Sequence, residues 1–229
     1  MKELRRKSFL TSSDARQRIL EAVKRNVSKP FYKSIKEEAF CGKKVRIGET
    51  GDGGKYVCNP AAVNREQCTL ISLGLNNQIV YDLHIHNVTG RKCKILGADK
   101  SEQRPETKKK YEEMGGMLFQ GMIPADVTIH QMMEKSGRTE VDLLKIDIES
   151  GEHTALEPFI RDYFVCQIFI EIHGTPAEHL EMIRKIARYG FRVFNVDENP
   201  YCAHCCEYSF INEMCMAQFG VVPLAITIP

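Results

Sequence analysis

The feature that most constrains the fold is a regular alternation of short apolar runs with longer amphipathic runs, from Cys68 to Val196. The apolar runs have the length of buried strands, whereas the amphipathic runs repeat apolar residues every three to four positions, as helices do. The predicted strands are Thr69–Leu73, Lys94–Ala98, Gly116–Gly121, Val141–Asp147, Cys166–Ile172 and Phe191–Val196. The predicted helices between them are Asn77–Val88, Pro105–Met114, Val127–Lys135, Glu152–Tyr163 and Pro176–Tyr189. Strands that alternate with helices favour a mostly parallel sheet covered on both faces, so we expect an open, doubly wound α/β fold.

The two ends of the chain depart from this alternation. A polar amphipathic helix is predicted over Thr11–Asn26, and residues 1–45 as a whole have a helical pattern. Near the other end, Glu207–Asn212 and Gln218–Val222 have the pattern of strands joined without a helix, which favours an antiparallel edge of the sheet. The predicted organisation is a helical N-terminal extension over residues 1–45 and one α/β domain over residues 46–229.

Composition and charge exclude several classes of protein. The 32 Lys and Arg residues nearly balance the 30 Asp and Glu residues, and a net charge of +2 gives no electrostatic case for a nucleic-acid binder. We expect no membrane span, because no apolar run reaches the roughly 18 residues that a spanning helix needs. The basic N-terminus is not followed by an apolar segment, so the expected location is cytoplasmic; the secretory pathway is the alternative if the N-terminus is truncated.

Nine cysteines are present, and an odd number cannot all pair within one chain. In the absence of a signal peptide, most of them are expected to be reduced thiols. The run from Cys202 to Cys206 resembles half of a zinc site, but a structural zinc ion normally needs two separated pairs of ligands. No second pair with suitable spacing is present, so a disulfide or plain thiols are the favoured interpretation.

Candidate cofactor-binding residues follow the first two predicted strands, where ligands bind in open parallel sheets. Ser72, Gly74 and Asn76 lie at the end of the first strand, and a glycine there lets the backbone approach a ligand closely. Asp99 and Lys100 end the second strand, where a carboxylate can accept hydrogen bonds from both ribose hydroxyls of a nucleoside cofactor. The alternative is that Asp99 caps the next helix. The dinucleotide fingerprint G-x-G-x-x-G is absent.

Four titratable side chains follow two later strands that we expect to be neighbours. Asp147 and Glu149 share one side of their strand if it continues to Glu149, and Glu171 and His173 share one side of theirs. Polar residues this regular in a buried strand are costly unless they have partners. The four groups together can act as a general base or bind a divalent ion such as Mg²⁺; the alternative for Glu149 is a helix cap.

At these residues the chain resembles the FkbM-type S-adenosylmethionine-dependent methyltransferases, and most of all their animal methyltransferase-like branch. The segments that carry the resemblance are residues 51–58, 72–77, 144–152 and 171–173, of which Leu-Lys-Ile-Asp-x-Glu is the most specific. The resemblance implies a class I methyltransferase fold, which is Rossmann-like, with S-adenosylmethionine as methyl donor and often a hydroxyl group as acceptor. It implies that Gly74 lines the methionine portion, that Asp99 holds the ribose, and that the four titratable groups line the reaction side.

The function expected from the residues and the resemblance together is O-methylation of a small-molecule or glycan hydroxyl, with Asp147, Glu171 and His173 as base or metal site. The alternative from another class is a non-catalytic methyltransferase-like binding module. A nicotinamide-dependent oxidoreductase is a third reading, which the missing G-x-G-x-x-G disfavours. A lid function is expected for the Gly51–Gly54 loop. The acceptor and the oligomeric state do not follow from the sequence.

Overall fold

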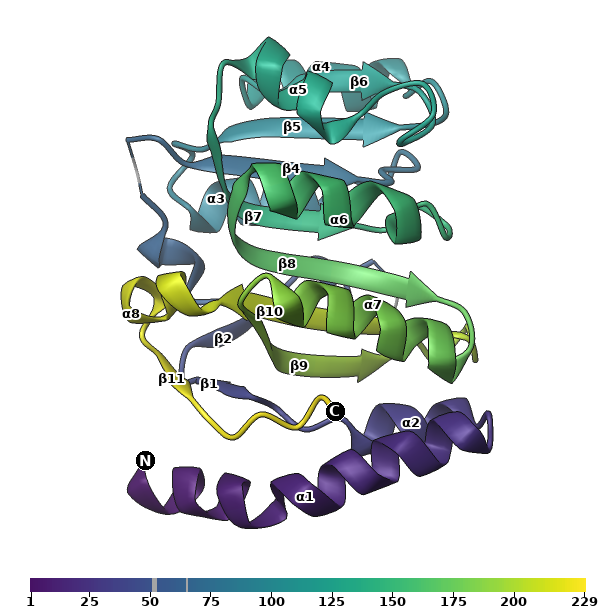
Figure 1. Ribbon diagram of the computed structural model, residues 1–229. Helices are drawn as coiled ribbons and strands as arrows, with labels where there is room; N and C mark the ends of the chain where they lie inside the picture. Colours follow the sequence, from purple (N-terminus) through teal and green to yellow (C-terminus); the bar gives the residue numbers. More distant parts are fainter. Residues whose placement is uncertain (51–52, 65) are drawn as a thin grey trace.

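A computed structural model describes residues 1–50, 53–64 and 66–229 (Figure 1). Its centre is a seven-stranded sheet, whose strands are β4 (Thr69–Leu73), β5 (Lys94–Asp99), β6 (Met117–Gln120), β7 (Glu140–Ile146), β8 (Phe164–His173), β9 (Phe191–Glu198) and β10 (Cys205–Asn212). Their order is β6-β5-β4-β7-β8-β10-β9. The pairs from β6 through β8 are parallel, while β10 runs antiparallel to both β8 and β9.

This strand order confirms the predicted fold class. The chain winds outward from β4 in two directions, which places the switch of strand order between β4 and β7 and the ligand crevice beyond their carboxyl ends. A sheet of this order with one antiparallel strand near its C-terminal edge is the class I methyltransferase fold, a Rossmann-like arrangement. The antiparallel strand β10 is inserted one position inside the edge, between β8 and β9.

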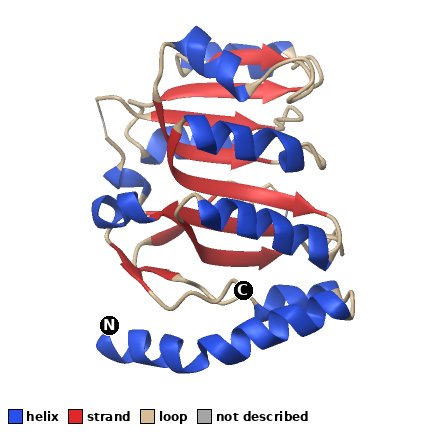
Figure 2. Ribbon diagram, in the orientation of Figure 1, coloured by secondary structure: helices blue, strands red, loops and turns tan. Residues whose placement is uncertain are grey.

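Helices cover both faces of the sheet (Figure 2). On one face lie α5 (Ile129–Ser136), α6 (Glu152–Asp162) and α7 (Pro176–Arg188), and on the other lie α3 (Val80–Val88) and α4 (Pro105–Glu113). The alternation of side chains along β8 shows why its sequence is apolar throughout, since Ile168 and Ile170 enter one core and Phe169 enters the other. Because both faces of the sheet are buried, polar side chains lie mainly at the ends of the strands.

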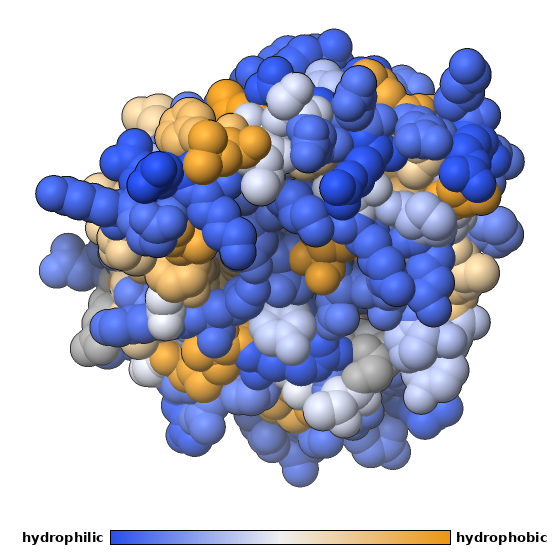
Figure 3. Space-filling model, turned by 90° about the horizontal axis from the view of Figure 1, so that it is seen from below, coloured by the Kyte–Doolittle hydropathy of each residue, from blue (hydrophilic) through white to orange (hydrophobic). Residues whose placement is uncertain are grey.

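The N-terminal segment packs on the α7 side of the sheet. Helix α1 (Lys2–Lys24) begins earlier than predicted and is followed by α2 (Ser28–Ser34). The carboxylate of Glu38 accepts hydrogen bonds from the backbone N–H groups of Thr227 and Ile228, so this segment also holds the C-terminus. Seen from this end, the surface is mostly hydrophilic with separate hydrophobic patches (Figure 3). The boundary at residue 45 stays a prediction.

Two small antiparallel pairs flank the main sheet. Strand β1 (Ala39–Cys41) pairs with β11 (Val221–Pro223), and β2 (Lys44–Ile47) pairs with β3 (Lys55–Cys58) in a hairpin. Of the glycine-rich loop expected to act as a lid, residues 51 and 52 lie outside the described residues. The remaining short elements are η1 (Pro60–Ala62), η2 (Glu213–Cys215) and α8 (Met216–Phe219). The predicted strand Gln218–Val222 is wrong in its first half, because α8 continues through Phe219 and ends at Gly220 in the left-handed region.

The prediction that most cysteines are reduced thiols is wrong. Eight of the nine pair in disulfides: Cys41–Cys58, Cys68–Cys93, Cys166–Cys215 and Cys202–Cys205. The ninth, Cys206, is free and buried. The sequence does not reveal these pairs because most join positions that only the fold brings together, such as the residues preceding the neighbouring strands β4 and β5. None of the helices in the described part of the chain combines the length and the hydropathy that a membrane span requires.

Candidate active site

A cavity of about 1000 Å³ opens beyond the carboxyl ends of the central strands. The predicted site residues that line it are Gly74, Asn76, Asp99, Lys100, Asp147, Glu149, Glu171 and His173. Ser72 is not among the described residues that line the cavity, because its side chain is buried within β4. The fold therefore brings the two predicted groups, one for the cofactor and one for the reaction, into a single cavity.

The first group is built around the turn after β4. Gly74 has a φ of +79°, and a Cβ atom on it would lie 1.6 Å from the backbone oxygen of Asp147, so no larger residue fits this conformation. The turn is held from two sides: Gly74 N–H donates to the carbonyl of Ala98 at 2.9 Å, and Lys145 Nζ donates to the carbonyl of Gly74 at 3.2 Å. Lys145 is fully buried, and burial lowers its pKa.

Asp99 joins two loops at the same end of the sheet. One carboxylate oxygen accepts the N–H of Asn76 at 2.7 Å, and the other accepts the N–H of Ser101 at 2.7 Å. The alternative that Asp99 caps the next helix is wrong: α4 begins at Pro105 with Arg104 as its N-cap, and the contact with Ser101 is a local turn before that helix. A carboxylate oxygen has two lone pairs, so each still has an acceptor position. The ribose-binding role of Asp99 stays a prediction, and the cavity position of the residue is compatible with it.

The second group contains a buried ion pair that sequence reasoning missed. Lys55 on β3 forms an ion pair with Glu207 on β10, and its Nζ lies 3.7 Å from Asp147 Oδ2. Burial alone would lower the pKa of Lys55, but Glu207 and Asp147 outweigh it and hold the pKa above its ordinary value. Burial would likewise raise the pKa of Asp147, but Lys55 and Lys145 lower it.

Glu171 lies at the junction of two clusters of possible metal ligands. In one cluster, ligand atoms of Asp147, Glu171 and Glu207 lie within 4.8 Å of one another; in the other, so do those of Glu171, His173 and Cys205. Burial and the two neighbouring carboxylates raise the pKa of Glu171 to about 8. In the first cluster the ammonium group of Lys55 already supplies a positive charge.

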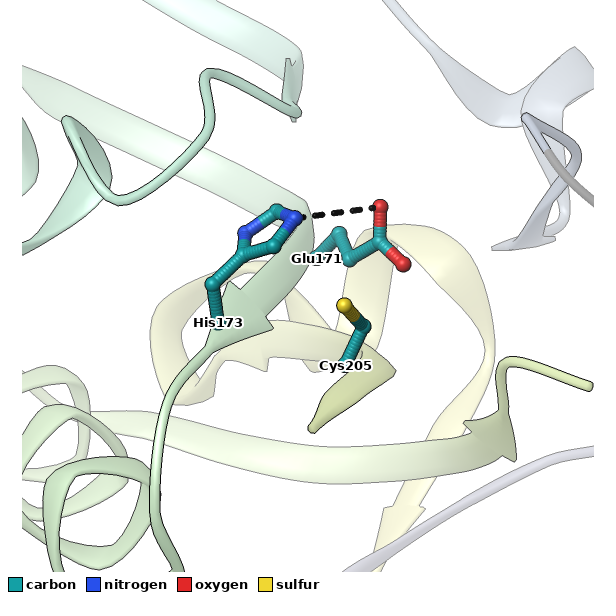
Figure 4. Close-up of side chains that lie close together, drawn as sticks. All are labelled: Glu171, His173 and Cys205. Atoms are coloured by element: carbon teal, nitrogen blue, oxygen red, sulfur yellow. Dashed lines mark ion pairs between the residues drawn. The ribbon is translucent and has the colours of Figure 1, made fainter. Parts of the chain in front are cut away.

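His173 is held by a buried carboxylate. Its Nδ1 lies 3.1 Å from Glu152 Oε1, and its Nε2 lies 3.8 Å from Glu171 Oε2 and 3.7 Å from Glu149 Oε2. The hydrogen bond to Glu152 raises the pKa of His173 to about 9, against the effect of burial. Figure 4 shows the imidazole, the Glu171 carboxylate and the Cys205 sulfur directed toward one another.

The expected shared parity of Asp147 and Glu149 is wrong, because β7 ends at Ile146. Glu149 lies in the following turn with a positive φ of 54° and a mostly exposed side chain. It nevertheless reaches the reaction side, through its contact with His173. His179 on α7 is fully buried behind this wall of the site.

The residues that sequence reasoning missed are Lys55, Glu152, Asn199 and Glu207. Glu152 and Lys55 lie in segments that carry the resemblance, so a signal existed, but nothing in the spacing showed which partners they meet. Asn199 donates from Nδ2 to Glu171 Oε1 at 2.6 Å. Glu207 lies directly opposite Glu171 in the β8–β10 pair, a relation that only the register of an antiparallel strand reveals.

The family model described as methyltransferase FkbM domain matches residues 21–193. None of the curated protein sequences matches significantly. Similar solved structures include fibrillarin from Aeropyrum pernix with natively bound S-adenosyl-L-methionine (TM-score 0.48, 11% identity, 66% of this chain and 68% of that chain). Two others are the Methanococcus jannaschii fibrillarin pre-rRNA processing protein (0.47, 14%, 78% and 96%) and a SAM-dependent methyltransferase from Aquifex aeolicus (0.40, 15%, 67% and 90%).

Proposed function

The chain belongs to the FkbM methyltransferase domain family, a family of S-adenosylmethionine-dependent methyltransferases, and on that premise we propose O-methylation of a small-molecule or glycan hydroxyl bound beside Asp147. The observation that carries the proposal is the single cavity, which joins the turn at Gly74 and Asp99 to the charged cluster at Asp147 and Glu171. Transfer between two bound groups requires such continuity, since donor and acceptor must be held in line.

The residues at the first group fit S-adenosylmethionine. The backbone at Gly74 has a conformation and a close approach that a Cβ atom would destroy. Asp99 presents its carboxylate to the cavity at the end of β5, where ribose hydroxyls are bound in related sheets. We assign Gly74 and Asn76 to the methionine portion and Asp99 with Lys100 to the nucleoside. When bound, the cofactor supplies an electrophilic methyl group on a sulfonium.

Asp147 is the residue assigned to the acceptor. Its carboxylate lies at the carboxyl end of β7, beside the Gly74 turn, and the positive charges of Lys55 and Lys145 act on it. In the proposed reaction Asp147 would accept the hydroxyl proton of the acceptor, while the bound cofactor would supply the methyl group and retain the carbon–sulfur electron pair. Glu171 and His173 form the wall next to this position. Mg²⁺ is not part of the proposal, because Lys55 supplies the cation at the acidic cluster.

Two experiments test the proposal. Isothermal titration with S-adenosylmethionine, S-adenosylhomocysteine and NAD should show binding of the two adenosyl compounds alone, weakened by Asp99→Ala. Radiolabelled methyl transfer is then measured against monosaccharides, oligosaccharides, phenols and a small-molecule cell extract. Asp147→Asn should lower transfer at least about 100-fold while leaving cofactor affinity within a few-fold. Full activity of Asp147→Asn contradicts the assigned role, and absence of binding by either adenosyl compound favours the non-catalytic module.

Two further assignments accompany this proposal. Because four disulfides in one chain are typical of oxidising compartments, we propose the lumen of the secretory pathway, the alternative to the expected cytoplasmic location. Alkylation of free thiols in the freshly isolated protein, followed by mass spectrometry, checks this: one modified cysteine is expected, and eight or nine contradict it. Membership of the animal branch stays a prediction from the sequence motifs.

A further inference from the structure

We propose that the reduced chain binds a zinc ion through Cys202, Cys205, Glu171 and His173, so that a disulfide and a metal are alternative states of one wall of the cavity. All four residues line the cavity. The proposal concerns metal binding alone and does not depend on methyl transfer, to which Asp147 rather than these residues was assigned.

The ligand atoms of the four residues lie close together. Cys205 lies directly opposite His173 in the antiparallel β8–β10 pair, so both side chains lie on the same face of the sheet. Glu171 is two residues before His173 and shares that face. Ligand atoms of these three residues lie within 4.8 Å of one another, as Figure 4 shows. Cys202 is bonded to Cys205, so its sulfur lies directly beside the Cys205 sulfur.

The chemistry of the four groups fits zinc. Zinc in proteins favours four ligands from cysteine sulfur, histidine nitrogen and carboxylate oxygen, and a pair of cysteines separated by two residues is a common half of such a site. The sequence contains that half as Cys202-x-x-Cys205 but shows no second pair. The fold supplies the second pair as Glu171-x-His173 on the neighbouring strand. A set with two sulfurs fits zinc better than Mg²⁺, which prefers oxygen.

The two non-sulfur ligands, His173 and Glu171, are already oriented by contacts of their other polar atoms. His173 Nδ1 lies 3.1 Å from Oε1 of Glu152, which leaves Nε2 directed toward Glu171 and Cys205. Glu152 is fully buried, and its Oε2 has no hydrogen-bond partner among the described residues. Glu171 Oε1 accepts from Asn199, which leaves Oε2 toward His173. A carboxylate behind the far nitrogen of a histidine is the usual support of a metal-bound imidazole.

The Cys202–Cys205 disulfide is accessible from the cavity. Cys202 and Cys205 line the cavity, whereas the cysteines of the other three disulfides are buried and are not among its described lining residues. A dithiol reductant entering the cavity therefore meets this disulfide first. The disulfide accepts two electrons and two protons, giving two thiols, while the reductant closes to its own disulfide. Zinc then binds the two sulfurs as thiolates, and both protons leave.

The test uses Co²⁺ as a visible stand-in for zinc on the full chain. A phosphine reductant is titrated in, and alkylation with mass spectrometry identifies the point at which only Cys202 and Cys205 are open. At that point we expect a single Co²⁺ per chain, with sulfur-to-cobalt charge-transfer bands and the visible bands of a tetrahedral ion, and full displacement by Zn²⁺. The oxidised chain should show neither set of bands. Absence of both sets in the selectively reduced chain overturns the proposal.

Variants identify the ligands. His173→Gln and Glu171→Gln keep the disulfide and should each weaken Co²⁺ binding at least about tenfold. Cys206→Ser is the matched control, since Cys206 neighbours Cys205 but enters the core on the opposite face of the sheet, and it should bind like the unmodified chain. Wild-type affinity in both His173→Gln and Glu171→Gln would refute the site. So would undiminished binding after replacing Cys202 and Cys205 together by serine.

Discussion

Lys55 provides the sharpest test of the buried charge cluster. We expect Lys55→Met to destabilise the protein by about 3–5 kcal/mol, the usual cost of leaving a buried charge without its partner. The side chain of Lys55 is 1% exposed, and those of Glu207 and Asp147 are 10% and 19% exposed. Methionine fills nearly the same volume, so the loss reflects charge rather than a cavity. After the change neither oxygen of Glu207 has a partner, because Oε2 already lacks one among the described residues.

A double variant measures the interaction between Lys55 and Glu207, apart from the contribution of each residue alone. In the double variant Lys55→Met with Glu207→Leu, both partners become apolar, and most of the lost stability should return, because a buried ion pair contributes little over apolar packing. The coupling free energy between the two positions should therefore be about 2 kcal/mol or more. Lys185→Met is the matched control: Lys185 also lies between two carboxylates, 3.1 Å from Glu181 and 3.9 Å from Glu157, but near the surface.

The assay is urea unfolding at neutral pH with the disulfides intact, followed by circular dichroism and extrapolated linearly to water. The Lys185→Met control should change the free energy of unfolding by less than about 1 kcal/mol. The reasoning is refuted if Lys55→Met costs no more than the control. It is equally refuted if the double variant loses the full sum of the two single losses, since the residues would then act independently.

Three further predictions follow from particular contacts. Gly74→Ala should cost about 1–3 kcal/mol of stability and abolish adenosyl-ligand binding in calorimetry, because its Cβ would overlap the backbone oxygen of Asp147; unchanged affinity would contradict this. Burial lowers the pKa of His179 from 6.5 to about 4, so the folded state disfavours the charged imidazole. The contribution of His179 to stability should be complete above pH 6.5 and should fall by about 3 kcal/mol as the pH drops to 4. Urea unfolding of His179→Gln should show a flatter dependence of stability on pH. Deleting residues 1–38 should abolish cooperative unfolding, because Ile19 and Phe31 are fully buried in the main core; a cooperative transition in the deletion variant would show that the rest folds alone.

Much of the fold was predictable because strand parity and burial act over a few neighbouring residues. The central strands β4, β7 and β8 are mostly apolar for the reason that Ile168 and Phe169 illustrate, namely that both faces of the sheet are covered there. The helix ends were predictable to within a few residues where a local signal exists. At the start of α7, for example, Thr175 and Glu178 form a capping box, and Pro176 between them is the first residue of the helix.

The charged partners were not predictable because they depend on register and on contacts between distant segments. The sequence shows Glu171 and His173 two residues apart, but not that Glu207 and Cys205 lie opposite them. The same holds for three of the disulfides, whose partners lie 17, 25 and 49 residues apart in the chain. The predicted parity of Glu149 failed for a local reason, since the chain leaves the strand at Ile146 and turns with a positive φ.

The hairpin β2–β3 shows why residues before the alternating region belong to the site. Three acidic side chains lie close together, from Asp147 just after β7, Glu171 on β8 and Glu207 on β10, and within the parallel core Lys145 on β7 supplies one positive charge against them. Lys55 comes from the hairpin, which is attached to the sheet by reciprocal 2.9 Å hydrogen bonds between the backbone of Cys58 and the side chain of Gln167. The Cys41–Cys58 disulfide ties this strand in turn to β1. The cluster is thus completed by segments outside the alternating region, so a core trimmed to the alternating strands would keep Asp147 and Glu171 but lose Lys55 and Glu207.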